Sequence, residues 1–420
     1  MLRILSSKDA PRLLKRRTAR LDEAEAVVRP ILEDVRRRGD AALLEYARRF
    51  DGFEGRSVLV SQARLEEAVR QLTPAFRRAL RVSEKNVAAF ARMQLPRPQR
   101  ITPAPGLRLS QIVRPLDAAA AYIPSGRYPL PSTAVMTVVP ARVAGVGQIL
   151  VCTPRPAPEI LGAARLLGAT HVFQMGGAHA IAAFAYGTKT VPRADRIVGP
   201  GNIYVAAAKK LLAGEVGIDF LAGPSEILLI AADGDPRAIA ADMLAQAEHD
   251  SDASAILLTP SRKLAEAVAA EVRRQLETLP TAATAREALR RNSAALVVSS
   301  LDEAVELSNR LAPEHLSIPS AGLLAKVRHA GSVFVGPWSP EAAGDYASGP
   351  NHVLPTSGAA RLRGGLSAAD FVKVISVQEL SRKALQQLAP AITALARAEG
   401  LEAHARSIEV RLEKKGGGGC

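Results

Sequence analysis

The stretch GPSEILLIAADGDPRAIAADMLAQAEHD, residues 223–250, decides the fold class of this chain. Its apolar run 227–230 is typical of a fully buried strand. A helix is expected directly after it, because Asp235 is a suitable N-cap and Pro236 a suitable first helical residue. A buried strand followed by a helix is the repeating unit of a parallel α/β sheet.

The expected helix over residues 236–249 carries a polar line beside its apolar stripe. Asp242, Gln246 and His249 fall at positions i, i+4 and i+7 of one face. A carboxylate, an amide and an imidazole in one line are typical of ligands. The alternative is an ordinary polar face whose C-terminal histidine complements the helix dipole. The helix alone leaves both interpretations open.

The strand–helix rhythm continues on both sides of this stretch and predicts two α/β units, each with its own parallel sheet. Residues 22–50 and 62–93 predict helices, and the last fifty residues predict helices that Pro390 and Gly400 interrupt. The further strands are expected at 108–113, 118–123, 148–152, 171–174, 254–259, 294–299 and 332–336, and the further helices at 158–167, 176–186, 261–278 and 302–311.

Composition narrows the classes of function. The net charge of +14 favours nucleic-acid binding as a function. Against it, aromatic residues make up only 4% of the chain, and no nucleic-acid-binding motif is present. No signal-peptide core and no apolar run of membrane-spanning length occur, so we expect a cytoplasmic protein with no membrane and no nucleic-acid partner. The two cysteines, Cys152 in an expected strand and Cys420 at the end, permit no disulfide framework.

Several residues whose side chains could act in catalysis or bind a metal ion lie in irregular segments. Glu314-His315 stands at an expected helix-to-strand turn, and Glu399 and His404 lie on either side of Gly400. The loop 344–352 follows the strand 332–336, and we expect it at the carboxyl end of the sheet, where α/β proteins bind ligands. Histidine, carboxylate and amide donors suit zinc or a similar divalent ion.

Several common enzyme motifs are missing. There is no HExxH motif, so a zincin protease is excluded. Ser225 lies in GPSE rather than GxSxG, which gives a hydrolase triad little support. Neither GxGxxG nor a P-loop is present, so any dinucleotide must bind without the usual glycine fingerprint.

Taken together, these features resemble the histidinol dehydrogenase family over almost the whole chain. The most specific segments are GPGNIYVAAAK at 199–209, IDFLAGPSEIL at 218–228, QAEHD at 246–250, APEHL at 312–316 and GDYASGPNHVLPT at 344–356. The resemblance implies a four-electron, NAD-dependent zinc alcohol dehydrogenase that oxidises L-histidinol to L-histidine through L-histidinal, the final step of histidine biosynthesis. It also implies a homodimer whose active site is shared between subunits.

The resemblance assigns roles by position. It implies Gln246, His249, Asp345 and His404 as zinc ligands, with His404 supplied by the partner chain. His315 would be the general base, and Glu314 would activate water. Substrate would be bound by Ser225, Gln246, His249, Glu314, His315, Asp345, Glu399 and His404, and NAD by Tyr122, His179 and Asn202. Two positions depart from the family pattern, because His179 stands where glutamine is usual and Ser125 where glycine is usual.

The resemblance also implies a fold and its boundaries. We expect two parallel-sheet Rossmann-like domains that lack GxGxxG, of the aldehyde-dehydrogenase-like kind, with small helical N- and C-terminal segments. The expected parts are an N-terminal arm at 1–16, a discontinuous first α/β domain at 17–123 and 225–366, a second α/β domain at 124–224, a C-terminal helical dimerisation segment at 367–413 and a flexible tail at 414–420.

Three other functions remain open on the sequence. The first is a related zinc- and NAD-dependent dehydrogenase that oxidises another polar alcohol, such as a sulfonated diol. The second is a basic nucleic-acid-binding protein, which would bind DNA or RNA in a salt-sensitive manner. The third is a metallohydrolase, which would form no NADH.

Overall fold

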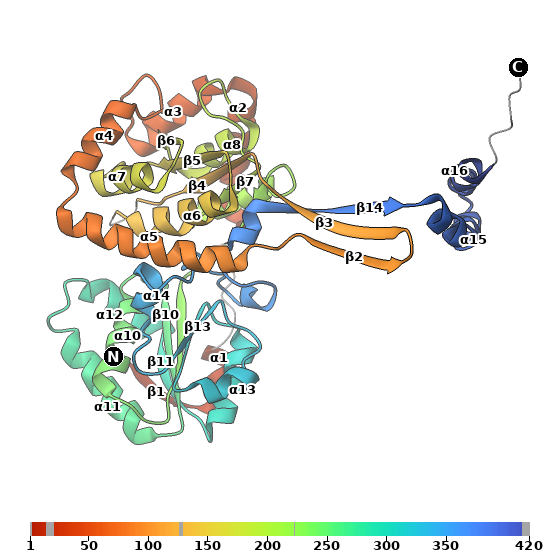
Figure 1. The fold of residues 1–420 in the computed structure, drawn as a ribbon. Helices are drawn as coiled ribbons and strands as arrows, with labels where there is room; N and C mark the ends of the chain where they lie inside the picture. The colour runs from red at the N-terminus through yellow and green to blue at the C-terminus, as the bar shows by residue number, and fades with distance from the viewer. Residues whose placement is uncertain (1, 14–20, 126–128, 222, 414–420) are drawn as a thin grey trace, which may run out of the picture. The chain divides into compact units, whose positions relative to one another are not determined.

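The computed structural model divides into two compact units. The main unit comprises Met1–Gln94 and Leu116–Phe371, and the tail unit comprises Leu95–Pro115 and Val372–Cys420. The main unit contains two parallel sheets (Figure 1), so the predicted α/β class is confirmed. The structure describes residues 2–13, 21–125, 129–221 and 223–413.

The first sheet has five parallel strands with helices on both faces. Along β4 (Ala118–Tyr122) every residue is buried, as expected for a central strand covered on two sides. In sheet order the strands are β6 (His171–Gln174), β5 (Gln148–Thr153), β4, β7 (Arg196–Val198) and β8 (Gly217–Ile218).

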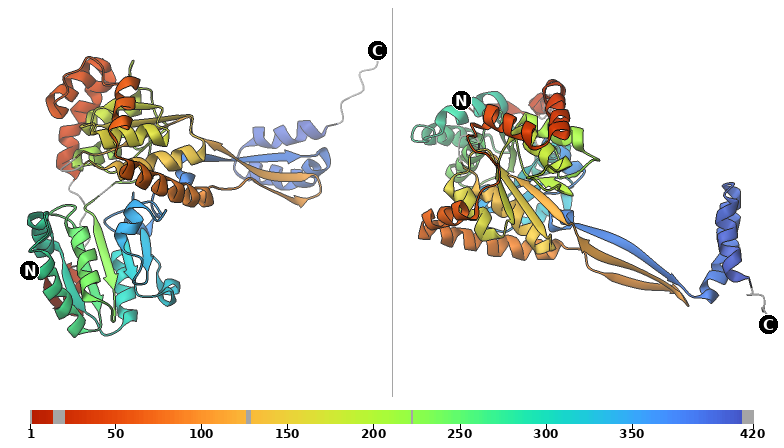
Figure 2. Two further views of the ribbon diagram at one scale, coloured as in Figure 1. Left: turned by 60° about the vertical axis from the view of Figure 1, so that its left-hand side comes forward. Right: turned by 90° about the horizontal axis from the view of Figure 1, so that it is seen from above.

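Alternation along these strands assigns the helices to the two faces (Figure 2). Ala119 and Ala121 share one core with helices α4 (Gln62–Gln71), α5 (Pro74–Gln94), α6 (Pro131–Ala144) and α7 (Pro158–Leu167). Ala120 and Tyr122 share the other core with helices α2 (Leu21–Arg38), α3 (Asp40–Asp51), α8 (Gly177–Tyr186) and α9 (Ile203–Leu212).

The second sheet has six parallel strands, and the first strand of the chain forms one of its edges. In sheet order they are β1 (Arg3–Ser6), β11 (Ala294–Val297), β10 (Ser254–Thr259), β9 (Glu226–Ile230), β12 (His315–Ile318) and β13 (Ser332–Val335). One face is covered by α10 (Pro236–Ala247), α11 (Arg262–Gln275) and α12 (Ala282–Asn292), and the other by α1 (Ala10–Leu13) and α13 (Leu301–Leu311).

The division into α/β halves differs from the expected domain boundaries. Helices α2 to α5 were expected in one domain with residues 225–366, but they cover the five-stranded sheet, whose strands span residues 118–218. Conversely, the expected N-terminal arm contributes β1, which pairs with β11. The periodicity of a helix predicts that one face is buried, but it does not reveal which sheet that face covers.

The tail unit is a three-stranded antiparallel sheet with two helices. Strand β3 (Leu107–Pro115) lies between β2 (Gln99–Ala104) and β14 (Val372–Leu380), and α15 (Arg382–Ala398) and α16 (Glu402–Leu412) follow (Figure 1). Gly106, with φ of +79°, permits the turn between β2 and β3.

This tail corrects two expectations. The last fifty residues are not all helical, because β14 pairs with β3 along nine residues. Pro390 does not interrupt a helix either, since it lies inside α15, whereas Gly400 follows that helix with φ of +76°. The expected flexible tail at 414–420 lies outside the described residues. Among the helices that the structure describes, each is too short or too polar to cross a lipid bilayer.

Candidate active site

A cavity of about 530 Å³ lies within the main unit and is lined from both of its parallel sheets. Seven of its lining residues bear directly on chemistry: Ser225, Gln246, His249, Glu314, His315, Asp345 and His352. Those of them that were expected to act together come from four separate segments of the sequence. The structure places them around one cavity.

The cavity lies at opposite ends of the two sheets. In the five-stranded sheet it lies at the carboxyl ends, since Pro124 follows β4 and Pro200 follows β7. In the six-stranded sheet it lies at the amino ends, since Ser225 precedes β9 and His315 is the first residue of β12. The expectation that loop 344–352 would lie at the carboxyl end of its sheet was therefore wrong.

Connectivity explains this placement. The parallel strands β9 and β10 require α10 to run back along the sheet, so its last turn reaches the amino end of β9. Helix α14 (Glu341–Tyr346) likewise brings Asp345 back toward His315, with 3.8 Å between Asp345 Oδ1 and His315 Nε2. The residues that could bind a ligand thus come from helix ends as well as from strand ends.

Helix α10 presents its last turn to the cavity. Asp235 caps the helix by accepting a hydrogen bond from the Arg237 backbone N–H, as its sequence predicted. Gln246 is fully buried, and neither its amide oxygen nor its amide nitrogen has a hydrogen-bond partner within the described residues. A buried amide rarely stays without a hydrogen-bond partner. The Gln246 side chain is therefore suited to bind a metal ion or a substrate, which is not part of the polypeptide.

Three donor side chains form one group. Ligand atoms of His249, Glu341 and Asp345 all lie within 4.8 Å of one another. Glu341 was not among the residues expected at the site. Its signal in the sequence was the spacing of Glu341 and Asp345, four residues apart, which places two carboxylates on the same face of a helix.

The electrostatics of this group favour a cation. Burial raises the pKa of Asp345 to about 6 and that of Asp242 to about 6. Burial also raises the pKa of Glu341, and the carboxylates of Asp345, Glu314 and Asp242 raise it further. A divalent ion would relieve this repulsion, and imidazole, carboxylate and amide oxygen are donors that zinc accepts. The residues present therefore fit a zinc ion.

His315 has the geometry of a base. Its Nδ1 lies 3.2 Å from the backbone carbonyl oxygen of Glu226, which can only accept, so Nδ1 carries the ring hydrogen. Its Nε2 therefore carries a lone pair, and it has no hydrogen-bond partner within the described residues. Burial lowers the pKa of His315 to about 3, which keeps the ring neutral before the reaction.

Glu314 directly precedes His315, and its Oε2 lies 3.8 Å from His315 Nδ1. Its Oε2 accepts a hydrogen bond of 2.9 Å from the backbone N–H of Glu226, and burial raises its pKa well above the usual range. One backbone segment at Glu226 thus holds both members of the Glu314-His315 pair, through its N–H and its carbonyl. The pair is positioned by main chain, which is the most rigid support available.

Gly344 allows α14 to approach the sheet closely. A Cβ atom at this position would lie 2.6 Å from Cε1 and 3.0 Å from Cζ of the Phe334 ring, which is buried on β13. We expect Gly344→Ala to displace α14, together with Asp345, and to lower zinc affinity and turnover by about tenfold or more. Metal analysis and steady-state assays measure both effects.

Gly364→Ala is the matched control, since a Cβ atom there meets nothing within 4 Å. Wild-type zinc content and turnover in Gly344→Ala would show that the close approach of α14 is not needed.

The three residues implied for NAD are placed differently from one another. Tyr122 is buried, and its hydroxyl oxygen accepts a hydrogen bond from the Gly177 N–H. His179 is buried too, with Nε2 2.9 Å from Asp51 Oδ2. Asn202 is exposed and caps α9 beside the cavity-lining residues Gly201 and Ile203. Of the three, Asn202 is thus the one next to lining residues of the cavity.

A buried ion pair supports the glycine-bearing turn before α9. Lys209 Nζ lies 2.8 Å from Asp219 Oδ1 and donates to the carbonyl oxygen of Gly199, and both side chains are almost completely buried. Asp219 also accepts hydrogen bonds from the backbone N–H groups of Gly199 and Phe220. The pair therefore ties together two turns that line the cavity.

We expect Lys209→Met to lower the free energy of unfolding by about 3–5 kcal/mol, because it leaves Asp219 buried without its cation. Urea unfolding measures this change. The neighbouring Lys210→Met is the control, since Lys210 pairs with Glu25 at the surface and should contribute much less. An equal loss in both variants would contradict the structural role of the buried pair.

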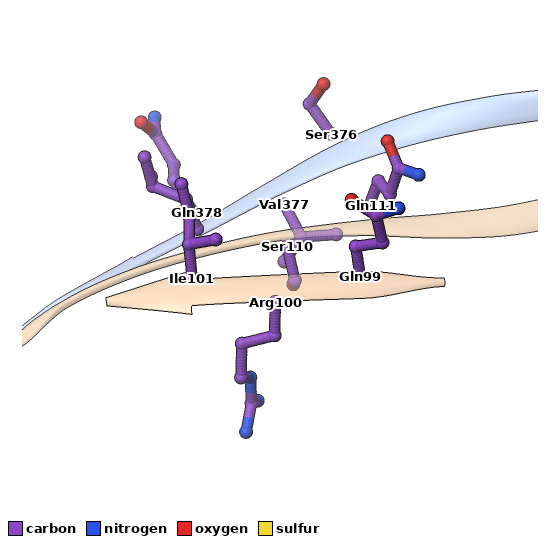
Figure 3. A pocket seen from close by; sticks show the side chains of 9 residues that line it. Gln99, Arg100, Ile101, Ser110, Gln111, Ser376, Val377 and Gln378 are labelled. Carbon is purple, nitrogen blue, oxygen red and sulfur yellow. The ribbon is translucent and has the colours of Figure 1, made fainter. Parts of the chain in front are cut away.

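Two of the expected site residues belong to the tail unit. Glu399 caps the C-terminus of α15 and His404 lies on α16, and both side chains are exposed there. A shallow hollow on the sheet of this unit is lined by residues such as Gln99, Ile101 and Ser376 (Figure 3). Its described lining contains one charged side chain, Arg100, and no group suited to acid–base or metal chemistry.

The family model, two curated relatives and one solved structure described below are all histidinol dehydrogenases. Residues 14–412 match the family model of histidinol dehydrogenase. The chain is 49% identical to a histidinol dehydrogenase of Geobacter sulfurreducens, covering 93% of this chain and 94% of that protein, and 46% identical to one of Rhizobium meliloti, covering 93% and 92%. A crystal structure of histidinol dehydrogenase from Elizabethkingia anophelis matches with a TM-score of 0.94 at 35% identity, covering 98% of both chains.

Proposed function

Since the chain belongs to the histidinol dehydrogenase family, we propose that it oxidises L-histidinol to L-histidine through L-histidinal, with two NAD, as the final step of histidine biosynthesis. The observation that supports this most is His315, whose unprotonated Nε2 lies beside a group of metal donors in one cavity. An alcohol oxidation needs both features, a base for the hydroxyl proton and a fixed orientation for the carbon that loses hydride.

In this proposal Gln246, His249 and Asp345 would hold zinc, and His404 of the partner subunit would complete the set. When bound, zinc would hold the substrate and lower the proton affinity of its hydroxyl group. The exposed apolar side chains of the tail unit, among them Leu395, Leu401 and Val410, are consistent with burial against a second copy. The enzyme would therefore be a homodimer with shared active sites.

The chain's own residues account for the proton steps. His315 Nε2 accepts the hydroxyl proton as hydride leaves for NAD, which gives the aldehyde. Glu314 then takes a proton from water, whose oxygen adds to the aldehyde carbon, and a second hydride leaves for a second NAD. The balance is one alcohol, one water and two NAD⁺ converted to one carboxylate, two NADH and three protons. Ser225 and Glu399 would contact the substrate during both steps.

Water is favoured over a thiol as the oxygen-delivering nucleophile. Cys152 is fully buried within β5, as its sequence predicted, and burial raises the pKa of its thiol well above the usual range. A thiol in that state is a poor nucleophile. The other cysteine, Cys420, lies outside the described residues. A covalent thioester route, which aldehyde dehydrogenases use, therefore has little support here.

For NAD we propose a site at the turn before α9. The N-terminus of a helix offers backbone N–H groups to phosphate, and Gly201 lets the main chain approach closely. Asn202 caps that helix, and Tyr122 and His179 are the further residues that the resemblance implies. We propose that the reaction takes place in the cytoplasm.

The test is the yield of NADH per histidinol consumed by the zinc-loaded enzyme. Two NADH per substrate would support the four-electron reaction, whereas one would limit the enzyme to the aldehyde.

Small sulfonated diols serve as competing substrates, and turnover of a diol without turnover of histidinol would favour the related dehydrogenase instead. NADH formation would also exclude a metallohydrolase as the main activity, and we expect no retardation of DNA or RNA at moderate salt.

A further inference from the structure

One buried group beside His315 has no role in the proposed mechanism. Glu341 is 3% exposed, and both of its carboxylate oxygens lack a hydrogen-bond partner within the described residues. An unpaired buried carboxylate is costly, because it is removed from water without compensation. A position that keeps such a group next to a reactive histidine is a candidate for a functional contribution.

The contact with His315 is specific to one edge of the ring. Glu341 Oε1 lies 3.2 Å from His315 Nδ1, on the same edge that the carbonyl oxygen of Glu226 approaches to 3.2 Å. The opposite edge carries Nε2, which lies 3.8 Å from Asp345 Oδ1. Glu314 Oε2 lies farther from Nδ1, at 3.8 Å. Acceptors thus border the nitrogen that carries the hydrogen, and the cavity side keeps the lone pair.

Helix α14 delivers both carboxylates to the ring. Glu341 and Asp345 are one helical turn apart, so they extend from the same face and reach the two edges of His315. The ring also packs against Phe334, with 5.9 Å between ring centroids, and Phe334 is the residue that Gly344 allows α14 to approach. The orientation of His315 therefore depends on the seating of this one short helix as well as on the Glu226 carbonyl.

We infer that Glu341 is a positioning residue for His315. The Glu226 carbonyl accepts the Nδ1 hydrogen, and the Glu341 carboxylate, 3.2 Å from Nδ1 without a hydrogen bond of its own, acts on that edge of the ring by charge and packing so that Nε2 faces the cavity. A direct metal contact is the competing role, since a ligand atom of Glu341 lies within 4.8 Å of those of His249 and Asp345. The direct contact is with His315, at 3.2 Å, and zinc content separates the two roles in the experiment below. The effect of Glu341 on catalysis rests on the proposed function, because it is measured as kcat for histidinol oxidation.

The experiment replaces Glu341 by glutamine, which has nearly the same shape but is neutral. With the zinc-loaded enzyme and histidinol, we expect kcat to fall by about 10- to 100-fold, the range typical of losing an orienting partner of an active-site histidine. KM should change by less than about threefold and zinc content should stay at the wild-type level. Glu341→Asp, which keeps the charge, should retain more activity than Glu341→Gln.

The matched control is Glu306→Gln, the same change at an exposed position on α13 that pairs with Arg328. It should leave kcat unchanged. An unchanged kcat in Glu341→Gln would overturn the inference, and so would a loss of zinc, because zinc loss would make Glu341 a metal ligand instead.

A second measurement does not depend on histidinol. Ring-nitrogen resonances of ¹⁵N-histidine report the tautomer, and the His315→Asn variant identifies the signals of His315. We expect a single Nδ1–H form in the wild type and shifted His315 ring-nitrogen resonances in Glu341→Gln, because the carboxylate beside Nδ1 is lost while the Glu226 carbonyl remains. Identical spectra would overturn the inference. If the wild type did not oxidise histidinol, the proposed function would fail, while these spectra would still decide the positioning role.

Discussion

Replacing His315 by asparagine should lower kcat for histidinol oxidation by about 10²–10⁴-fold, the range expected for loss of a general base. The asparagine amide can still donate to the Glu226 carbonyl in place of Nδ1, so the fold around the site should persist. What disappears is the lone pair of Nε2, which has no other partner within the described residues. Steady-state assays with histidinol and NAD measure the effect.

The two oxidation steps supply an internal control for that experiment. Glu314→Gln should mainly impair oxidation of the aldehyde, because water must be activated only in the second step. We therefore expect histidinal to accumulate in Glu314→Gln but not in His315→Asn, where the first step is already slow. Turnover near the wild-type rate in His315→Asn would remove His315 as the base.

Replacing His249 by alanine should abolish tight zinc binding. His249 supplies the nitrogen donor of the group it forms with Asp345 and Glu341, and its loss leaves only the two carboxylates in that group, a poorer set for zinc. Metal analysis after dialysis measures retained zinc. His171→Ala is the control, since His171 contacts Thr170 and Phe173 on β6 and does not line the cavity.

Zinc binding can also be followed without turnover. Trp338 is the single tryptophan of the chain, is 93% exposed and lies three residues before Glu341. Its fluorescence should change when α14 is held by the metal in the wild type, and should not respond to zinc in His249→Ala. Retention of stoichiometric zinc by His249→Ala would be evidence against this ligand set.

The same site should lose zinc in acid. In the metal-free protein burial raises the pKa of Asp345 to about 6, so below that pH a proton must leave before the carboxylate can bind the metal. Affinity is therefore expected to fall by about tenfold for each pH unit below 6, and to be insensitive to this group above it.

Much of the fold could be predicted because its signals are local. The helix over 158–167 and the strand over 171–174 were predicted with the bounds that the structure has. Strand β14 could not be predicted in the same way, because it is defined by pairing with β3, more than 250 residues earlier. A strand with such a distant partner is stabilised by that pairing rather than by its own sequence.

The candidate site was predictable where residue chemistry is visible in short motifs. Gln246, His249, Glu314, His315 and Asp345 were expected together, and the structure places all five around one cavity. Glu341 was missed because a glutamate in a helix normally indicates a solvated face, and its spacing of four residues from Asp345 does not by itself show burial. Its burial and its position beside the His315 ring are visible only in the structure.

By itself, then, the amino-acid sequence determined the strand–helix alternation, the turns and the set of reactive side chains, since these depend on neighbours a few residues apart. Tertiary structure alone decided that the N-terminal helices cover the five-stranded sheet and that β1 joins the other sheet. It also decided that the reactive residues meet at the amino ends of β9 and β12. These outcomes depend on which apolar faces bury the most surface together, a property of the whole packed chain that no short segment contains.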